Sequence, residues 1–272
     1  MSTTTQAAGS RDDRERVSLV EEATRTTVLR LQGGYRRDNV AAVAAVARLR
    51  REAGREPHAS PTSWGLDDLE ALTRLREKQA EENDDTERYL VSRKRHEREA
   101  QVEREDRAVH LAVTLWALHQ QSLREEAMHV HGWSLGRAVR QLAQDKQAKQ
   151  EKPEAPAEEE QREGEQQGAV EDVSPTIRKR FVRLGTSSDI DILGRRLREM
   201  VLLLREARIP LDYGRLAGEL DRWQDEGERA GVRRAWGREF HRVYRAAASD
   251  DDEAKPQPPA PPGDPVADDA GE

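Results

Sequence analysis

The amino-acid sequence predicts an all-α protein, a helical bundle of roughly eight or nine helices in two packed lobes. Apolar residues recur three and four positions apart along most of the chain, which is the period of one helix face. Helix-capping residues such as Asn39, Ser134 and the Ser174–Pro175 pair precede several of these segments. The sequence lacks the alternating β-branched runs between turns that indicate strands.

Two helices are predicted before residue 54. We expect the first helix to end at Gly33–Gly34, because a glycine pair is more typical of a helix end than of a phosphate-binding loop. Its predicted apolar face consists of Val17, Val20, Ala23, Thr27 and Leu31. Asn39 caps the second helix, which runs toward Gly54 and Pro57. The predicted face of this second helix carries Val40, Val43, Ala44, Ala47 and Arg51.

A broadly apolar segment marks the centre of the predicted bundle. A short helix follows Trp64–Gly65 with Leu66, Leu69, Leu72 and Leu75 on one face. Residues 83–106 are nearly all charged, which predicts either a solvated helix or an excursion from the bundle. The next apolar residues cover most of a helix circumference, as expected of a central helix: Val109, Leu111, Ala112, Val113, Leu115, Trp116 and Leu118. Ser134 then caps a helix with Leu135, Ala138, Val139 and Leu142 inward.

Four helices are predicted after residue 173. Ser174–Pro175 begins the first of them and Gly185 ends it, with Ile177, Phe181 and Leu184 inward. The second has the clearest apolar stripe and stops before Pro210: Ile190, Leu193, Leu197, Met200, Val201 and Leu204. The third carries Leu211, Tyr213, Leu216, Leu220 and Trp223. The last carries Val232, Trp236, Phe240 and Val243.

Composition divides the chain into five segments. Residues 1–12 and 248–272 are polar or proline-rich tails, and residues 146–173 form a low-complexity acidic insertion; we expect all three to be disordered. Residues 13–145 form the predicted N-terminal lobe and residues 174–247 the C-terminal lobe. Deleting residues 146–172 or 249–272 should therefore leave the bundle folded.

The formal net charge of −7 conceals a basic body with acidic additions. Residues 248–272 hold eight acidic residues against one lysine, and residues 146–172 hold nine against four basic residues. Residues 174–245 instead hold 17 Arg and Lys against 11 acidic residues. The body is thus compatible with a polyanionic partner, although 39 Arg against 7 Lys can also reflect a compositional bias of the source genome.

No sequence motif specifies catalysis. The phosphate-binding GxxxxGK[ST] loop, the dinucleotide-binding GxGxxG, the GxSxG elbow and HExxH are absent, as is cysteine. His119, His129 and His131 lie near Glu125 and Glu126, but packed or exposed histidines explain them better than a metal site. No acid stands alone in an apolar segment. We expect a non-enzyme without cofactor, metal or small-molecule substrate. The chain has no membrane span, and we expect it in the cytoplasm.

Rows of basic residues are the main functional signal. On the predicted helix from Ile190, Arg195, Arg198 and Arg205 face outward, with Arg196 on the flank. The other basic residues singled out are Arg36, Arg37, Arg50, Arg51, Arg137, Arg140, Arg178, Lys179, Arg180, Arg183, Arg233, Arg234, Arg238, Arg242 and Arg245. Guanidinium groups suit phosphate oxygens, so these rows fit a nucleic-acid backbone. Solvated faces paired with acids such as Glu199 and Glu239 fit them equally well.

Six sequence blocks span residues 31–240: LQGGYRRDNVAAVAAVARLRR, WALHQQS, SLGRAVRQLA, RKRFVRLGTS, IPLDYGRLAGELDRWQ and VRRAWGREF. Taken in order, they resemble the CasB family, the small subunit of the type I-E CRISPR surveillance complex, Cascade. The tails and residues 83–106 and 146–172 look like additions to a shorter family core.

The resemblance implies an all-α, non-catalytic subunit of antiviral defence. It would occur in two copies within Cascade, beside other subunits, and contact the guide RNA and target DNA of the R-loop. By block, the implied nucleic-acid-binding residues are Arg50, Arg51, Arg137, Arg178, Lys179, Arg180, Arg195, Arg196, Arg233, Arg234 and Arg238. A protein-interaction module without a nucleic-acid role remains the alternative. A helix-turn-helix regulator is disfavoured. The segment from Phe181 to Leu197 could mimic this motif, but its second helix is long and strongly apolar, which does not suit a helix that reads DNA bases.

Overall fold

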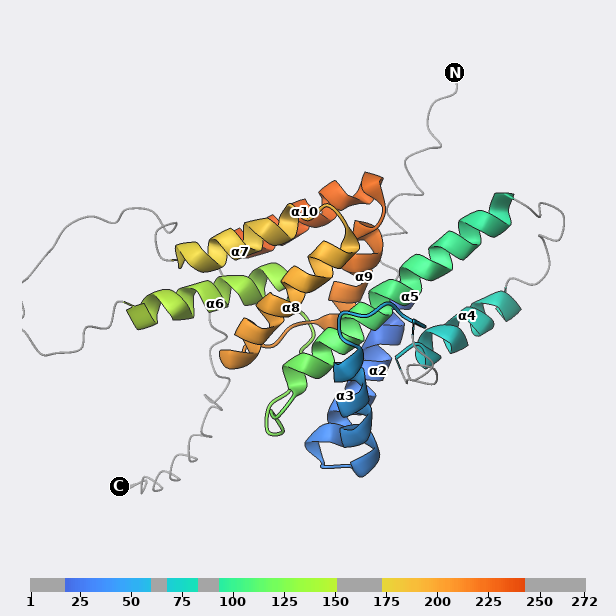
Figure 1. The fold of residues 1–272 in the computed structure, drawn as a ribbon, viewed down its shortest axis with the longest axis horizontal. Helices are drawn as coiled ribbons and strands as arrows, with labels where there is room; N and C mark the ends of the chain where they lie inside the picture. The colour runs from blue at the N-terminus through green and yellow to red at the C-terminus, as the bar shows by residue number, and fades with distance from the viewer. Residues whose placement is uncertain (1–17, 60–67, 83–92, 151–172, 243–272) are drawn as a thin grey trace, which may run out of the picture. The chain divides into compact units, whose positions relative to one another are not determined.

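The computed structural model describes residues 18–59, 68–82, 93–150 and 173–242. Within these residues the chain forms nine α-helices and no strand, which confirms the all-α prediction (Figure 1). The helices are α2 (Leu19–Arg36), α3 (Val40–Glu52), α4 (Glu70–Glu82), α5 (Arg93–Gln120), α6 (Leu135–Gln150), α7 (Pro175–Gly185), α8 (Ile190–Glu206), α9 (Tyr213–Trp223) and α10 (Glu226–His241). None of these helices is long and apolar enough to cross a lipid bilayer.

The second half of α5 is the centre of the bundle, as its broad apolar pattern predicts. It packs against α2, α3, α8 and α9 (Figure 1). Ala108, Val113 and Trp116 are fully buried because these four helices cover different sides of α5. The first half of α5 is exposed over residues 96–103, so this part of the charged segment is a solvated helix.

The junction of α2 and α3 differs from the prediction. Gly33 and Gly34 do not end α2, which continues to Arg36. The chain turns instead at Asp38, whose φ of 59° places it in the left-handed region. A Cβ atom on Gly34 would lie 2.7 Å from the Cβ of Ala42, so this glycine permits the close approach of α3 to α2.

The predicted face of α3 is also wrong, although its cap is correct. The side chain of Asn39 accepts hydrogen bonds from the backbone N–H groups of residues 41 and 42. The helix buries Ala42, Ala45, Val46 and Leu49, whereas Val40, predicted to be inward, is 84% exposed. Alanine and valine occupy every position of VAAVAAVA, so the sequence does not define which face of the helix is buried. The close contact at Gly34 does.

The later helices follow their predicted faces. Ser134 caps α6 through its hydroxyl, which accepts from the backbone N–H of Arg137, and α6 extends to Gln150 rather than stopping near residue 145. Pro175 is the first residue of α7, and all six residues of the α8 stripe are buried. The carboxylates of Asp189 and Asp212 supply two further caps, for α8 and α9.

Helices from both halves of the sequence pack on each other. α9 lies against α2 and α5, and α10 lies against α6 and α9. A Cβ on Gly136 of α6 would lie 2.7 Å from the backbone nitrogen of Phe240, which shows how closely α6 and α10 cross. The division into two lobes remains an interpretation. Several predicted parts lie outside the described residues: Val17, Leu66, Val243, residues 151–172 and both tails.

Candidate nucleic-acid interface

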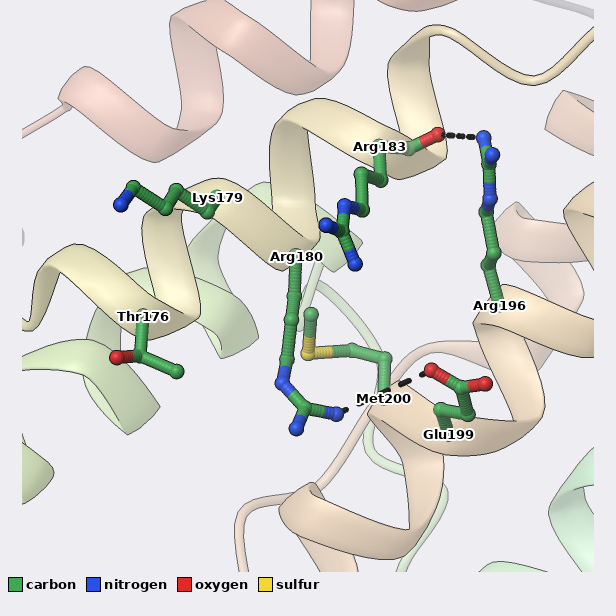
Figure 2. A pocket seen from close by; sticks show the side chains of 7 residues that line it. All are labelled: Thr176, Lys179, Arg180, Arg183, Arg196, Glu199 and Met200. Carbon is green, nitrogen blue, oxygen red and sulfur yellow. Dashed lines mark hydrogen bonds and ion pairs between the residues drawn. The ribbon is translucent and has the colours of Figure 1, made fainter.

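Four basic side chains gather in a hollow between α7 and α8. We call Lys179, Arg180, Arg183 and Arg196 the α7–α8 cation cluster. Together with Thr176, Glu199 and Met200 they line a cavity of about 270 Å³ (Figure 2). Arg183 follows Lys179 by four residues and Arg180 by three, which places the three α7 cations on one side of the helix.

The packing of α7 orients this face toward solvent. Ile177 and Leu184 are buried on another side of the helix, so α7 is anchored while Lys179, Arg180 and Arg183 remain exposed. Arg196 of α8 donates to the backbone carbonyl of Arg183 and, at 3.0 Å, to the hydroxyl of Ser187. These bonds hold α8 against the end of α7 and complete the cluster.

The charge of the cluster is poorly compensated. Glu199 is the single carboxylate among its lining residues, which leaves a formal charge of +3. Oε2 of Glu199 lies 3.9 Å from Nη1 of Arg180, and both side chains are largely exposed, so this ion pair is weak. Within the described part of the chain, no carboxylate lies at ion-pair distance from Lys179 or Arg183. An anion could therefore bind without first breaking a strong internal salt bridge.

The neighbouring predicted residues face other surfaces. Arg178 lines a separate apolar pocket of about 230 Å³ between α7 and α10, with Phe181, Trp236 and Phe240. Arg195 lines a third cavity, of about 310 Å³, near Arg107 and Glu56. The structure thus divides the basic runs RKR and RR between different sites.

Several predicted arginines stabilise the fold. Arg198 donates to the carbonyl of Ala53 at 2.9 Å, and Arg205 donates to that of Gln121 at 3.1 Å, so the outward row on α8 ties this helix to the first half of the chain. Arg36 and Arg140 likewise donate to backbone carbonyls, those of Glu125 and Phe240.

The remaining predicted residues are dispersed. Arg137 stacks on Trp133 with its guanidinium 4.1 Å from the ring centroid, and Arg233 stacks on Trp223 at 4.9 Å. Arg37 lines a cavity between α2 and α3, and the Nε of Arg50 is buried without a hydrogen-bond partner. The exposed residues include Arg51, Arg234, Arg238 and Arg242, and Arg245 lies outside the described residues.

Comparison with known proteins identifies the family. The family model described as CRISPR-associated protein Cse2 matches residues 45–241. The chain belongs to the Cse2 family. The crystal structure of CasB from Thermobifida fusca is 34% identical, with a TM-score of 0.59 over 84% of this chain and 100% of that chain. The resemblance to CasB seen in the sequence is confirmed.

Two further solved structures resemble the Cse2 chain more distantly. A chain from a CRISPR RNA-guided surveillance complex is 20% identical, with a TM-score of 0.48 over 82% of this chain and 93% of that one. The crystal structure of M. ruber CasB shares 23% sequence identity with this chain. Its TM-score is 0.43, and the match covers 72% of this chain and 83% of that chain. No curated protein matches. The family match includes α7 and α8 but not Arg36 and Arg37.

The Cse2 chain also contains a buried acid that the sequence analysis missed. Glu219 of α9 is 3% exposed, and its carboxylate accepts hydrogen bonds from Nε of Arg215 and Nε1 of Trp236. Burial raises the pKa of Glu219 despite these donors. Burial also raises the pKa of Asp221 to about 6. The i, i+4 pair of Arg215 and Glu219 within an apolar stripe was the available signal.

Two of the histidines near the loop after α5, His119 and His129, are packing residues, whereas the side chain of His131 is exposed. His119 is fully buried and its Nδ1 lies 2.8 Å from the hydroxyl of Tyr213. Burial lowers the pKa of His119 to about 3, so it is neutral at physiological pH. His129 Nδ1 accepts from the backbone N–H of Tyr213. Among the residues described, no three His, Cys, Asp or Glu side chains are grouped to hold a metal ion.

Proposed function

We propose that this Cse2-family chain is the non-catalytic small subunit of a type I-E CRISPR surveillance complex, Cascade, in which the α7–α8 cation cluster contacts nucleic-acid phosphates. The observation that carries the proposal is the cluster itself, with four cations against one carboxylate on an accessible surface. Its partners would be the guide RNA, the target DNA, other Cascade subunits and a second copy of itself. A cytoplasmic location belongs to the same proposal.

The geometry of the cluster suits a phosphate backbone. Lys179 and Arg183 are one helical turn apart, about 6 Å along the axis of α7, so the row can contact more than one phosphate of the same strand. Arg180 adds a planar fork that can bind two phosphate oxygens at once. No aromatic side chain lines this cavity, so base stacking is not supported and the contacts would be independent of sequence.

Such contacts would stabilise the R-loop. Replacing a DNA duplex by a guide–target heteroduplex is a nearly balanced exchange, which protein contacts with the backbone can tip. Target choice would still come from base pairing. The subunit would thus change how long target DNA stays open without changing which DNA is selected.

The alternative, a helical protein-interaction module, has one observation in its favour. Five of the predicted arginines donate to backbone carbonyls within the chain: Arg36, Arg140, Arg196, Arg198 and Arg205. For these residues a structural role is sufficient. The exposed cations on α7 make no such bonds to backbone carbonyls. Their substitution therefore distinguishes the nucleic-acid role from the protein-interaction role.

Reconstitution with the guide RNA and the other Cascade subunits tests the proposal. We expect the chain to co-purify with the complex and to lower the dissociation rate of target DNA. The variant Lys179→Glu/Arg183→Glu should co-purify equally well but lose this effect. Failure of the wild-type chain to join the complex would contradict the proposal. Incorporation of both chains with identical DNA dissociation would favour the protein-interaction alternative.

A further inference from the structure

The apolar pocket between α7 and α10 indicates a partner other than nucleic acid. We call this cavity of about 230 Å³ the α7–α10 pocket. We infer that it docks an acidic segment of a partner protein, which inserts one large apolar side chain between the two helices. The docking rests on the pocket itself, and the assignment of the segment to another Cascade subunit rests on the proposed function.

The pocket and the cation cluster occupy different sides of α7. Arg178, Val182 and Gly185 follow one another by four and three residues and line the pocket from one face of the helix. At 3.6 residues per turn, Arg180 and Arg183 of the cluster lie on a different side. The pocket can therefore be altered without changing the cluster.

Two pairs of stacked aromatic side chains hold the pocket in shape. Phe181 of α7 stacks on Phe240 of α10 with ring centroids 5.0 Å apart, so the two helices lie side by side (Figure 1). Trp236 of α10 stacks on Trp223 of α9 at 5.6 Å. Because these rings are already packed, little ordering of the pocket is needed when a ligand binds, which favours affinity.

Two glycines keep the pocket open although the packing of the described residues does not require them. Gly185 ends α7, and Gly237 lies inside α10. A Cβ atom on either would lie in open space among the described residues, and neither glycine has a positive φ. Glycine is unfavourable inside a helix, so Gly237 lowers the stability of α10 without allowing a closer contact within the chain. It leaves room for a group from outside.

The exposed part of the pocket suits an aliphatic side chain. Val182 is 55% exposed, whereas Trp236 and Phe240 are 2% and 5% exposed. The ring faces are thus covered, and a nucleobase would find little aromatic surface on which to stack. The cavity is also smaller than the about 300–1,000 Å³ of most small-molecule sites. One large apolar side chain of a protein partner fits both observations.

Charge complementarity defines the rest of the segment. Arg178 and Arg233 line the pocket from α7 and α10, and no carboxylate is among its lining residues. Within the described part of the chain, neither guanidinium group is paired with an acidic side chain. Arg233 lies 4.9 Å from the ring centroid of Trp223, which helps to fix its position. Since arginine binds carboxylates through two parallel hydrogen bonds, we expect Asp or Glu close to the apolar anchor.

Peptide selection tests the docking without any other Cascade component. A phage-displayed library of random dodecapeptides is selected against the full-length chain. The enriched peptides should share a large apolar residue with Asp or Glu close by. Their affinity should fall about tenfold or more for Gly237→Leu, which fills the pocket, and for Arg178→Glu/Arg233→Glu.

Gly231→Leu is the matched control, because Gly231 lies on α10 outside the pocket lining and its Cβ would be no closer than 4.0 Å to Arg234. Its affinity for the peptides should change by less than about twofold. Both leucine variants should melt at or above the wild-type temperature, since leucine favours a helix more than glycine does. Selection of no common peptide pattern, or equal binding to the wild type, Gly237→Leu and Arg178→Glu/Arg233→Glu, would overturn the docking.

Photo-cross-linking in the reconstituted complex tests the assignment to a Cascade subunit. Val182 is replaced by the photoreactive amino acid p-benzoylphenylalanine, and mass spectrometry identifies what it joins. We expect a segment of another protein subunit that contains an apolar residue beside Asp or Glu. A link to nucleic acid, or no link in the assembled complex, would overturn the assignment. Failure of the wild-type chain to join the complex would contradict the proposed function and the assignment, whereas the peptide selection would still decide the docking.

Discussion

Trp236 of α10 donates a 2.7 Å hydrogen bond from its indole Nε1 to Oε2 of Glu219 on α9, and both side chains are buried. Trp236 also stacks on Trp223 with ring centroids 5.6 Å apart. The bond gives this buried carboxylate a second donor, in addition to the Arg215 guanidinium that compensates its charge. It thus couples the basic helix α10 to the core helix α9.

Removing this hydrogen bond should destabilise the chain more than removing an equivalent indole that makes none. Trp236→Phe leaves Glu219 with one donor fewer and should cost about 1–3 kcal/mol beyond the loss of packing. Trp223→Phe is the matched control, because its Nε1 is buried without a partner. The free energy of unfolding, measured in denaturant, should be lower for Trp236→Phe. Equal losses would show that the bond contributes nothing.

Stability should depend on the protonation of Asp221. Burial raises the pKa of Asp221 from 3.8 to about 6 in the folded chain. Between pH 4 and 6 the folded state therefore holds a proton that the unfolded state has lost, and stability falls as pH rises through this window. Because the carboxyl group is partly exposed, we expect a loss of only about 1 kcal/mol. Asp221→Asn should remove this component. The free energy of unfolding of the variant should therefore rise relative to that of the wild type between pH 4 and pH 7. A constant difference would contradict the assignment.

Two adjacent glycines of α2 should respond oppositely to alanine. Gly34→Ala places a Cβ 2.7 Å from that of Ala42, forces α3 away, and should cost about 1–3 kcal/mol. Gly33→Ala brings its Cβ no closer than 3.6 Å to Arg37 and should stabilise the helix by about 0.5 kcal/mol. Thermal unfolding of the two variants distinguishes these effects. Similar melting temperatures would show that Gly34 is not a packing residue.

The core can be tested at the centre of the α8 stripe. Leu197 is fully buried, and Leu197→Ala should cost about 2–5 kcal/mol through the lost contacts and the cavity left behind. Leu202 on the same helix is 42% exposed, so Leu202→Ala should cost less than about 1 kcal/mol. Denaturant unfolding measures both. A loss below about 0.5 kcal/mol for Leu197→Ala would place the wrong face of α8 inward.

The helix faces were predictable where large and polar residues alternate with a clear period. The α8 stripe is an example, because Leu197 and Met200 stand among charged residues that fix the phase. The phase of α3 was not predictable, because its first eight residues are all alanine or valine and its packing depends on Gly34 of another helix.

The candidate site was predictable only in part. The row of cations on α7 follows from the spacing of Lys179 and Arg183. The roles of the other arginines depend on distant backbone, as Arg198 shows by donating to a carbonyl 145 residues earlier in the chain. Local sequence contains no information on such a contact, so a phosphate-binding arginine and a structural one look alike.

The most direct test of the central claim is the salt dependence of target-DNA affinity. Reconstituted complexes would carry the wild-type subunit or Lys179→Glu/Arg183→Glu. The control Arg74→Glu/Lys78→Glu makes the same change of charge on α4. If the two α7 cations contact phosphates, the log–log slope should fall by about 1.4–1.8 for their reversal and remain unchanged for the control. An unchanged slope and affinity, with the α7 variant still incorporated, would contradict the phosphate contacts.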